Sequence, residues 1–259
     1  MREPFLFVVF AMMIPGLLPA QKGPRKLDLT YSFSAETIYW PNAEGFRLRV
    51  DSAGINEKGY FYAANTYSGG EHGGTHLDAP LHFAQGMPSV DRIALDRLIA
   101  PGIVVDVGKN AAADPDYLAS VADFQNWEKE NGKIPEGCIL LVRTGWGKFY
   151  PDRKKYLGTD GRGEQAVAEL HFPGIDPAAA TWIAANRRIS ILGIDTASID
   201  RGQSQMFEVH RILFKAGICA LENVANMDQL PARGFEVIAL PMKIQGGTGA
   251  PVRVVALLP

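Results

Sequence analysis

Short apolar runs separated by polar, turn-forming residues recur along most of this chain. Residues 103–107 and 139–143 are continuous runs of branched apolar side chains, which is typical of strands buried on both faces. Residues 26–34 instead alternate apolar and polar side chains, as in a strand with one buried face. The same reasoning predicts further strands at residues 46–50, 59–64, 189–194, 218–222, 235–240 and 252–258.

Three segments between these strands have helical character. A helix over residues 124–131 is predicted after a capping-box-like start at Ser120. Asp176 and the proline after it are a helix-start pattern for residues 178–187, and residues 207–215 carry a third helical pattern. Strands with a few interspersed helices predict an α/β fold, arranged as a mixed sheet or a partly closed barrel with peripheral helices.

The composition of the 259 residues is that of an ordinary globular protein, with 47% hydrophobic and 21% charged residues. A formal net charge of −2 gives no electrostatic reason to expect nucleic acid or an anionic membrane surface as a partner. No internal repeat, low-complexity tract or flexible linker divides the chain. We therefore expect residues 21–259 to form one domain.

The beginning of the chain differs in kind from the rest. Met1 and Arg2 precede an apolar run at residues 5–18, which is shorter than the ~20 residues that a transmembrane helix needs. A basic start, an apolar middle and Ala20 before a polar residue are typical of a secretory signal, so residues 1–20 are predicted to be a cleaved signal peptide. The mature protein would then be secreted or lumenal, with no membrane partner. A buried or membrane-associated N-terminal helix is the alternative.

Export would place the protein in an oxidising compartment, where disulfides form. The chain has two cysteines, Cys138 and Cys219, and each lies in an apolar run that predicts a buried strand. A disulfide between buried strands must also meet a strict Cα spacing, so we expect two free core cysteines.

The densest chemistry lies in residues 71–83, which read E-H-G-G-T-H-L-D-A-P-L-H-F. His72, His76, Asp78 and His82 fall within eleven residues, although the whole chain has five histidines. His76 and Asp78 are two positions apart and would point to the same face of a strand. The glycines and the proline let this segment turn and fold back. A polar loop with solvated histidines is the alternative, but the clustering indicates a site for a divalent ion such as zinc or manganese.

This stretch resembles the H-x-G-T-H-x-D-x-P-x-H-F signature of the cyclase-type metal-dependent hydrolases, a family that includes bacterial kynurenine formamidases and isatin hydrolases. The resemblance continues through R-T-G-W-G, H-F-P-G, G-I-D-T-A-S-I-D, H-R-I-L, A-L-E-N and P-M-K-I-Q-G-G-T-G-A-P-V-R, and it covers nearly everything after residue 27. It implies the swivelling β/β/α fold, which is compatible with the predicted elements. A homodimer is also expected.

The resemblance implies roles for the polar residues. His72, His76 and Asp78 would hold a first ion. His210 and Glu222 match formamidase residues that hold a second ion, with Asp78 as the bridge between the two. Sequence alone leaves His210 open to another reading, as a helix-capping or surface residue.

The number of ions depends on which branch of the family the chain follows. In the isatin hydrolase branch, the resemblance implies one manganese ion with a glutamine close to it. Gln203 in D-R-G-Q-S would match that glutamine. If Gln203 faces the ion, we expect one manganese per chain, with His210 contacting the substrate. Otherwise Gln203 is an ordinary loop residue. The cofactor is therefore expected to be one Mn²⁺ or Zn²⁺ ion, with a second ion as the alternative.

His82 is the candidate acid/base. It lies four residues beyond Asp78, close enough to reach a water on the ion without binding the ion itself. An imidazole that titrates near pH 6.5 is suited to moving a proton between a water and a leaving amide nitrogen. A fourth metal ligand is the alternative role, and the resemblance favours the acid/base.

Aromatic side chains could line a pocket for a planar substrate, although in α/β chains they more often belong to the core. Trp146 is the best placed, because it follows the end of a predicted strand, where such folds bind ligands. The Q-G-G-T-G segment would let backbone amides approach a bound oxygen, with a hydroxyl donor at Thr248, unless it is a simple β-turn. The predicted substrate contacts are Trp40, Phe61, Tyr62, Trp146, His171 and Thr248.

These features predict a metal-dependent amidohydrolase that opens a cyclic amide such as isatin, to give isatinate. A metal-activated water would attack the carbonyl, and His82 would return the proton to nitrogen. Isatin ranks first because E-H-G-G-T-H-L-D-A-P, T-I-Y-W-P and D-R-G-Q-S look closer to that branch of the family. The alternatives are an arylformamidase acting on N-formylkynurenine and a secreted binding protein that performs no chemistry.

Overall fold

The structure, a computed structural model, describes residues 23–259. The signal peptide predicted for residues 1–20 lies outside this part of the chain. Within the described part, none of the helices combines the length and the apolar character that crossing a bilayer requires.

A closed barrel forms the centre of the fold. The strand order β12-β11-β5-β7-β9-β10-β4 returns to its start because β4 pairs with both β10 and β12. Two strands share one edge of β12: its residues 249–251 pair with β4, and its residues 255–258 pair with β1. The run from β5 to β10 is parallel and the other pairs of this sheet are antiparallel, so the predicted α/β class with a mixed sheet is confirmed. The strands span Arg25–Asp28 (β1), His76–Asp78 (β4), Ile99–Asp106 (β5), Ile139–Arg143 (β7), Ile191–Ile194 (β9), Cys219–Glu222 (β10), Arg233–Pro241 (β11) and Gly249–Leu258 (β12).

The continuous apolar runs form the centre of this sheet because both of their faces are covered. Along β7, Ile139 and Leu141 point into the barrel, whereas Leu140 and Val142 pack under the helices. This alternation gives the fold two cores, one inside the barrel and one between the sheet and the helices. Each large side chain buried in this way contributes roughly 1.5–3 kcal/mol.

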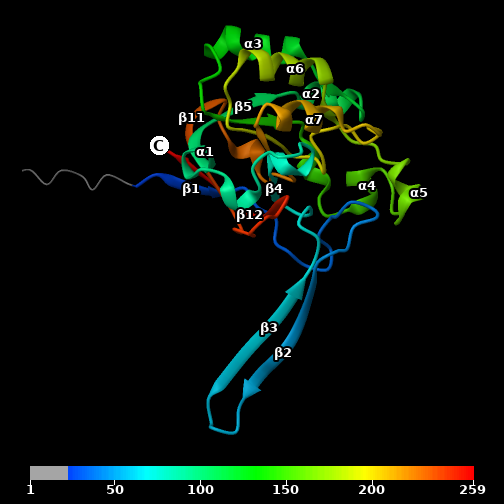
Figure 1. Ribbon diagram of the computed structural model, residues 1–259, viewed down its shortest axis with the longest axis vertical. Coiled ribbons are helices and arrows are strands. Elements are labelled where there is room, and N and C mark those ends of the chain that lie inside the picture. Colours follow the sequence, from blue (N-terminus) through cyan, green and yellow to red (C-terminus); the bar gives the residue numbers. More distant parts are fainter. Residues whose placement is uncertain (1–22) are drawn as a thin grey trace, which may run out of the picture.

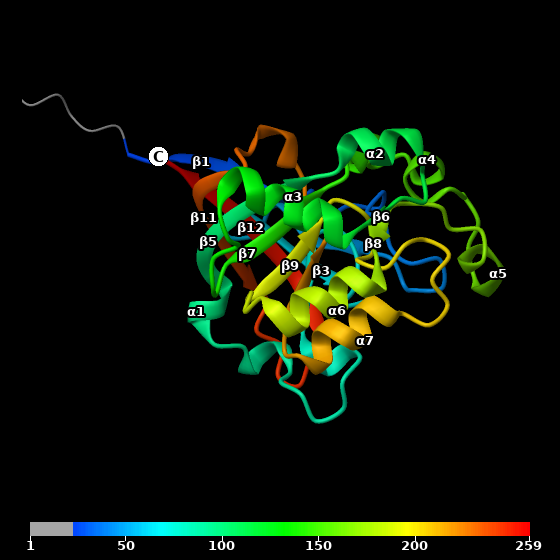
Figure 2. The same cartoon turned by 90° about the horizontal axis from the view of Figure 1, so that it is seen from above.

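Three helices cover the outer face of the sheet (Figures 1 and 2): α3 (Val121–Asn131), α6 (Pro177–Asn186) and α7 (Glu208–Lys215). Capping fixes where the first two begin. The backbone N–H of Ser120 donates to the Asp123 carboxylate at 2.7 Å, and that of Ala178 donates to the Asp176 carboxylate at 2.8 Å. All three predicted helices are confirmed, with ends displaced by a few residues.

Several short elements were not predicted, because segments of two to six residues are too short to show a period. Residues 29–34 also leave the sheet, so β1 is shorter than the predicted strand. The additional elements are β6 (Leu118–Ala119), β8 (Gly174–Ile175), α1 (Leu95–Leu98), α2 (Gly108–Ala113), α4 (Arg153–Leu157), α5 (Glu164–Val167) and the 3₁₀ helices Pro80–His82, Val90–Arg92, Trp146–Phe149 and Met227–Gln229.

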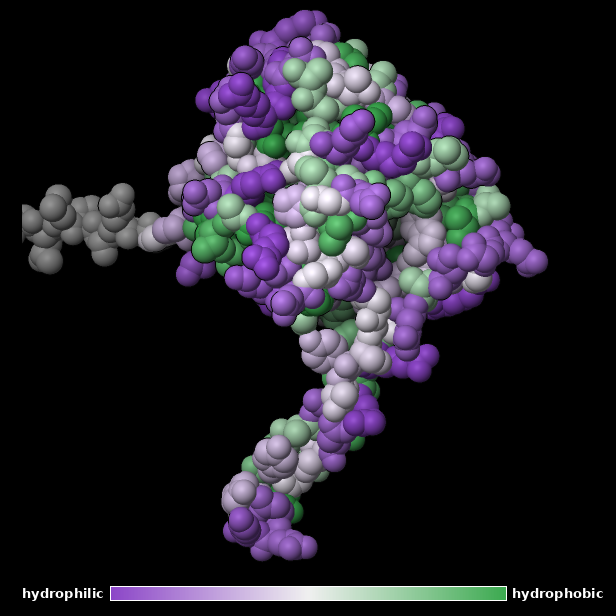
Figure 3. Space-filling view, viewed as in Figure 1, coloured by the Kyte–Doolittle hydropathy of each residue, from purple (hydrophilic) through white to green (hydrophobic). Residues whose placement is uncertain are grey.

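A long hairpin projects from the body (Figures 1 and 3). Its strands are β2 (Arg47–Ile55) and β3 (Phe61–Ser68), which pair with each other in a sheet of their own. Apolar side chains on this arm are largely exposed, including Val50 at 63%, Ile55 at 70% and Phe61 at 65%. The two strands were predicted at residues 46–50 and 59–64, but the sequence pattern did not indicate that the arm would leave the body.

Both cysteines are buried and free. Cys138 lies in the core under the helices, whereas Cys219 points into the barrel. The sheet therefore separates the two thiols, which explains why they do not pair.

Candidate metal centre and active site

Strand β4 presents two of the predicted ligands on one face. Leu77 is buried in the barrel core, so His76 and Asp78 on either side of it point outward. On the neighbouring strand, Glu222 lies directly opposite His76. Nε2 of His76 is 3.1 Å from Oδ1 of Asp78 and 3.4 Å from Oε2 of Glu222. The two-residue spacing thus produces a compact group of one imidazole and two carboxylates.

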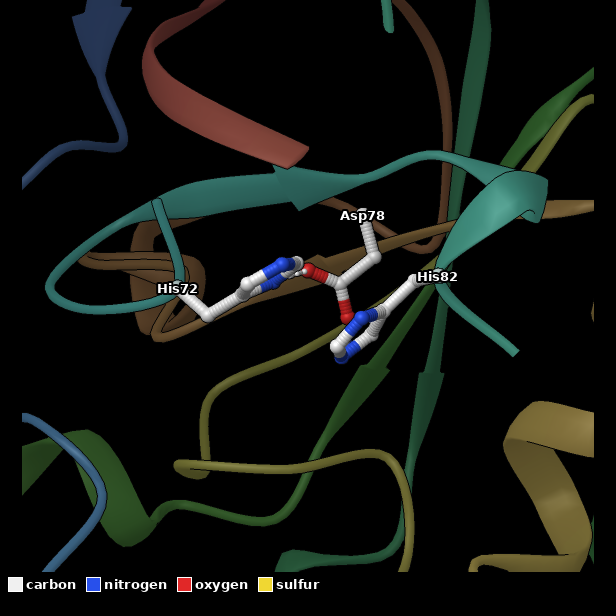
Figure 4. Close-up of side chains that lie close together, drawn as sticks. All are labelled: His72, Asp78 and His82. Carbon is white, nitrogen blue, oxygen red and sulfur yellow. Dashed lines mark hydrogen bonds and ion pairs between the residues drawn. The ribbon is translucent and has the colours of Figure 1, made fainter. Parts of the chain in front are cut away.

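A turn and a short helix bring two further imidazoles to the same place. Gly74 adopts a left-handed φ of +55°, which lets the chain turn between His72 and β4. After β4, Pro80 begins the 3₁₀ helix that ends at His82. The rings of His72 and His82 stack with their centroids 3.8 Å apart, and the Asp78 carboxylate points toward both rings (Figure 4).

Helix α7 supplies His210. Its Nε2 lies 3.3 Å from Oδ2 of Asp78 and 3.2 Å from Oε1 of Glu222. Its Nδ1 donates to Oδ2 of Asp200 at 2.6 Å, and the same carboxylate oxygen accepts the backbone N–H of His210 at 3.2 Å. Asp200 therefore holds both the first turn of α7 and the ring that this turn carries.

The hydrogen bonds fix which nitrogens face the cluster. Nδ1 of His76 donates to the carbonyl oxygen of Gly74 at 2.9 Å, and Nδ1 of His210 donates to Asp200. In both rings Nε2 is left to face the carboxylates, and Nε2 of His76 is buried without a hydrogen-bond partner among the described residues. Buried nitrogen and carboxylate donors converging in this way fit a borderline divalent cation, because such an ion satisfies all of them at once.

The electrostatic balance of the site favours positive charge. Burial alone would lower the pKa of His76, but the adjacent Asp78 carboxylate outweighs burial and raises the pKa to about 9. Burial would likewise lower the pKa of His210, but hydrogen bonds to three carboxylates hold it well above its usual range. Burial would raise the pKa of Asp78, but His72 and His76 hold it well below its usual range. Without a metal ion, protons supply the positive charge that the carboxylates require.

Metal binding is therefore expected to release protons. At pH 7, below the pKa of about 9, His76 is protonated in the metal-free protein, and an ion can bind only after this proton leaves. Metal affinity should accordingly weaken as the pH falls below about 9. Calorimetric titration with Zn²⁺ in two buffers of different ionisation enthalpy measures the number of protons released. A value of zero at pH 7 would contradict this charge balance.

The ligand atoms form two groups that share Asp78. One group consists of Asp78 with His72 and His82, and the other of Asp78 with His76 and Glu222. Within each group the ligand atoms lie within 4.8 Å of one another. The grouping differs from the predicted one, in which His72 and His76 served the same ion. The shared position of Asp78 is that of a residue able to contact two ions.

A cavity of about 240 Å³ opens onto this cluster. It exceeds the ~150 Å³ that holds one benzene ring, so it has room for a small aromatic molecule with polar substituents. Trp40, Phe83 and Phe207 form a continuous aromatic wall, with ring centroids 6.0 Å apart between Trp40 and Phe207 and 5.2 Å apart between Phe83 and Phe207. Of the aromatic residues predicted to contact substrate, Trp40 lies here.

Three other predicted aromatic contacts lie elsewhere. Phe61 and Tyr62 belong to the projecting hairpin and are exposed. Trp146 is 7% exposed and packs in a separate apolar cluster, where its Nε1 donates to the carbonyl oxygen of Tyr156 at 2.8 Å. Its position after a strand suggested a ligand contact, but the 3₁₀ helix that begins there turns the indole into the core.

Gln203 and His171 form a separate surface group. Nε2 of Gln203 donates to Oδ1 of Asp116 at 2.6 Å, and Nδ1 of His171 lies 2.9 Å from the other oxygen of the same carboxylate. Neither residue lines the cavity that contains the metal cluster. The expectation that Gln203 reaches the ion is therefore not met, because its side-chain amide donates to Asp116 instead.

Thr248 lies behind the metal cluster. Its hydroxyl is 2.8 Å from Nε2 of His72, and it does not line the cavity. The predicted hydroxyl donor to substrate thus contacts a candidate ligand instead.

Several residues of the site were missed by the sequence analysis. Asp200 ends the G-I-D-T-A-S-I-D segment, and its position ten residues before His210 could have indicated a carboxylate partner for that ring. Phe83 follows the last histidine of the motif, where an aromatic neighbour would border the site. Asn223 ends the A-L-E-N segment, which was noted only for its glutamate, and nothing in the local sequence pattern distinguishes Phe207; both line the same cavity.

Comparisons with known proteins agree with this geometry. Residues 27–201 match the family described as "Putative cyclase". The chain is 37% identical over 209 residues to an isatin hydrolase of Roseibium aggregatum, covering 78% of this chain and 77% of the relative. It is 28% identical over 230 residues to a kynurenine formamidase of Salinibacter ruber, covering 88% and 95%. The crystal structure of an isatin hydrolase bound to the product analogue thioisatinate superposes with a TM-score of 0.82 at 33% identity, covering 90% of this chain and 92% of the other.

The matched region includes the H-G-G-T-H-L-D-A-P-L-H-F stretch and with it strand β4, which carries His76 and Asp78. The buried cluster of imidazoles and carboxylates is suited to a divalent metal ion. The chain therefore belongs to the cyclase family of metal-dependent hydrolases and is an amidohydrolase acting on carbon–nitrogen bonds other than peptide bonds.

Proposed function

We propose that this enzyme hydrolyses a cyclic amide fused to an aromatic ring, with isatin as the substrate and isatinate as the product. The observation that carries the proposal is the aromatic wall of Trp40, Phe83 and Phe207 directly beside the metal cluster. Offset or edge-on stacking on such a wall holds a planar bicyclic molecule in a fixed plane. The similarity to isatin hydrolases, one of them bound to thioisatinate, supports the same substrate class.

The residues that would hold metal are His76, Asp78, Glu222 and His210 in one group, and His72 with the same Asp78 in the other. A divalent ion bound there supplies a water nucleophile at neutral pH and polarises a carbonyl group. The cluster occupies one side of the cavity and the aromatic wall another, so a bound lactam can direct its carbonyl carbon toward the ion while its ring stacks.

His82 would act on the proton. Burial lowers the pKa of His82 to about 4, so the ring is neutral at pH 7 and has a free nitrogen lone pair. A neutral imidazole beside the cluster would accept a proton from the attacking water and return it to the amide nitrogen, so that the nitrogen does not depart as an anion. Its stacking on His72 holds the ring within reach of that position.

A substrate comparison tests the proposal. Protein loaded with Mn²⁺ or with Zn²⁺ is assayed by absorbance with isatin and, in parallel, with N-formylkynurenine. We expect the higher kcat/KM for isatin, and complete loss of turnover after chelation. A higher value for N-formylkynurenine would favour the arylformamidase, and metal-loaded protein that turns over neither compound would favour a binding protein.

The proposed metal content is one Mn²⁺ or Zn²⁺ ion per chain, with the second group around Asp78 as a further site. Because Gln203 is held by Asp116, the expectation of a single manganese ion no longer has its original basis. Elemental analysis of active protein measures the number directly. Two tightly bound zinc ions per chain would favour the formamidase-like arrangement.

We further propose that the enzyme is a homodimer held by the β2–β3 arm. A two-stranded hairpin is marginally stable alone in water, yet here β2 and β3 extend away from the body. Val50, Ile55 and Phe61 expose apolar surface along it, which in soluble proteins marks an interaction site. Pairing with a second copy in two-fold symmetry covers both arms at once.

Shortening the arm is expected to give monomers. Residues 50–65 would be replaced by a two-residue Asn-Gly turn, which keeps the base of the hairpin. Light scattering coupled to size exclusion should then report the mass of one chain, whereas the intact protein should report two. A control in which the exposed, polar Lys58 is changed to Ala should remain dimeric. A shortened protein that still has the mass of two chains would contradict the proposal.

A further inference from the structure

We infer that Glu71 and Thr248 form a positioning pair that fixes which nitrogen of His72 carries the proton, and so which nitrogen is offered to the metal ion. Neither Glu71 nor Thr248 lines the substrate cavity. The inference rests on the metal centre and does not depend on the choice of substrate.

The pair forms one continuous chain of contacts. The Thr248 hydroxyl and the Thr248 backbone N–H both donate to Oε2 of Glu71, at 2.7 and 2.9 Å. The same hydroxyl oxygen is 2.8 Å from Nε2 of His72. On the other side of the ring, Nδ1 of His72 is 2.7 Å from Oδ1 of Asp78. Every polar atom of the His72 ring is therefore engaged, one by the pair and one by the cluster.

Counting protons along this chain gives a single arrangement. The Thr248 hydroxyl donates to the Glu71 carboxylate, so its one proton is directed there. The hydroxyl oxygen then has only lone pairs left for His72, so the imidazole must provide the proton at Nε2. In a neutral ring this leaves Nδ1 bare, facing Asp78 as a second electron-pair donor. Two such donors 2.7 Å apart are stabilised by a metal cation in contact with both.

The backbone around Thr248 is shaped to hold these contacts. A Cβ on Gly247 would lie 2.8 Å from Oε1 of Glu71, and a Cβ on Gly249 would lie 2.6 Å from Cε1 of His72. Both flanking positions therefore have to be glycine for the carboxylate and the ring to fit. The carbonyl oxygen of Thr248 also accepts a hydrogen bond from the backbone N–H of Ala79 at 2.8 Å, which connects the turn to the residue that follows β4.

Loss of either member has a distinct expected effect on His72. In Thr248→Val, Nε2 loses its acceptor, and the proton can move to Nδ1, where it competes with the metal ion. In Glu71→Ala, the freed hydroxyl can rotate and donate to Nε2, which also places the proton on Nδ1. In Thr248→Ser the hydroxyl is kept, so the arrangement should be kept as well.

Zinc affinity tests the inference in the full-length protein. Competition against a chromophoric chelator at pH 7 should show a 10- to 100-fold weaker affinity in Thr248→Val, the usual cost of losing a partner of a metal-bound histidine. Glu71→Ala should also weaken zinc binding, whereas Thr248→Ser should keep the wild-type affinity. Thr159→Val is the matched control, because Thr159 donates to Glu169 at the same 2.7 Å distance outside the site. If Thr248→Val weakens zinc binding no more than Thr159→Val does, the inference is wrong.

A spectroscopic measurement separates positioning from general stability. In zinc-loaded protein with ¹⁵N-labelled histidine, long-range ¹H–¹⁵N spectra distinguish a ring protonated at Nε2 from one protonated at Nδ1. With five histidines in the chain, a His72→Ala spectrum assigns the signal. We expect the proton at Nε2 in the wild-type protein and in Thr248→Ser. A wild-type ring protonated at Nδ1 would overturn the inference whatever the outcome of the isatin assay.

Discussion

Changing Asp78 to Asn is expected to remove both metal binding and hydrolysis. The substitution keeps the size of the side chain but removes the one carboxylate that faces His72, His76 and His210 together. The amide is a weaker ligand and cannot balance the charge of the ion. Because the ion contributes several kcal/mol of transition-state stabilisation, activity should fall by at least about 10³-fold.

Elemental analysis and the isatin assay measure the two effects on the same sample. Asp116→Asn is a suitable control, because Asp116 also contacts a histidine but lies outside the cavity. The control should keep its metal and its activity. Full metal content in Asp78→Asn would mean that the ion lies elsewhere and that the cluster has been assigned wrongly.

His82→Ala is expected to lower kcat by ~10²–10⁴, the usual contribution of a general acid/base, while the protein keeps its metal. The substitution removes a ring whose pKa of about 4 leaves it neutral at pH 7 and able to accept a proton. His171→Ala, which changes an exposed histidine of the Asp116 group, provides the control and should leave kcat unchanged.

The metal content of His82→Ala separates the two roles considered for this residue. His82 belongs to one of the two groups of ligand atoms around Asp78, so its geometry also permits direct binding to an ion. Loss of metal together with activity would identify His82 as a ligand, and the proton would then need another carrier.

The sequence predicted those parts of the fold and the site that are encoded locally. The apolar runs of β5 and β7 could be read because both faces of these strands are buried. Likewise, the spacing of His76 and Asp78 defines one face of a strand wherever that strand lies. The capping residue Asp176 marked the start of α6 for a similarly local reason.

Other features depend on contacts between distant segments and could not be read in this way. Strand β4 is three residues long, too short to show a period, yet it closes the barrel. The direction of the Gln203 side chain is set by Asp116, 87 residues earlier in the chain. The indole of Trp146 was expected at a ligand site, but its N–H is taken by the backbone of Tyr156. In each case the deciding partner lies outside the local sequence pattern, although for Trp146 it is ten residues away.

The shared edge of β12 has a consequence for the order in which the molecule is assembled. Strand β4 emerges from the ribosome early, but its partner at residues 249–251 follows about 170 residues later. At 5–20 residues per second this interval lasts roughly 10–30 s. For most of that time the β4 histidine and aspartate also lack the glutamate of β10, and for all of it they lack β12. His210 and Glu222 are made before β12, but β4 is paired on both edges only when the last strand has joined the barrel. We therefore expect capture of the ion at the final stage of folding rather than at its nucleation.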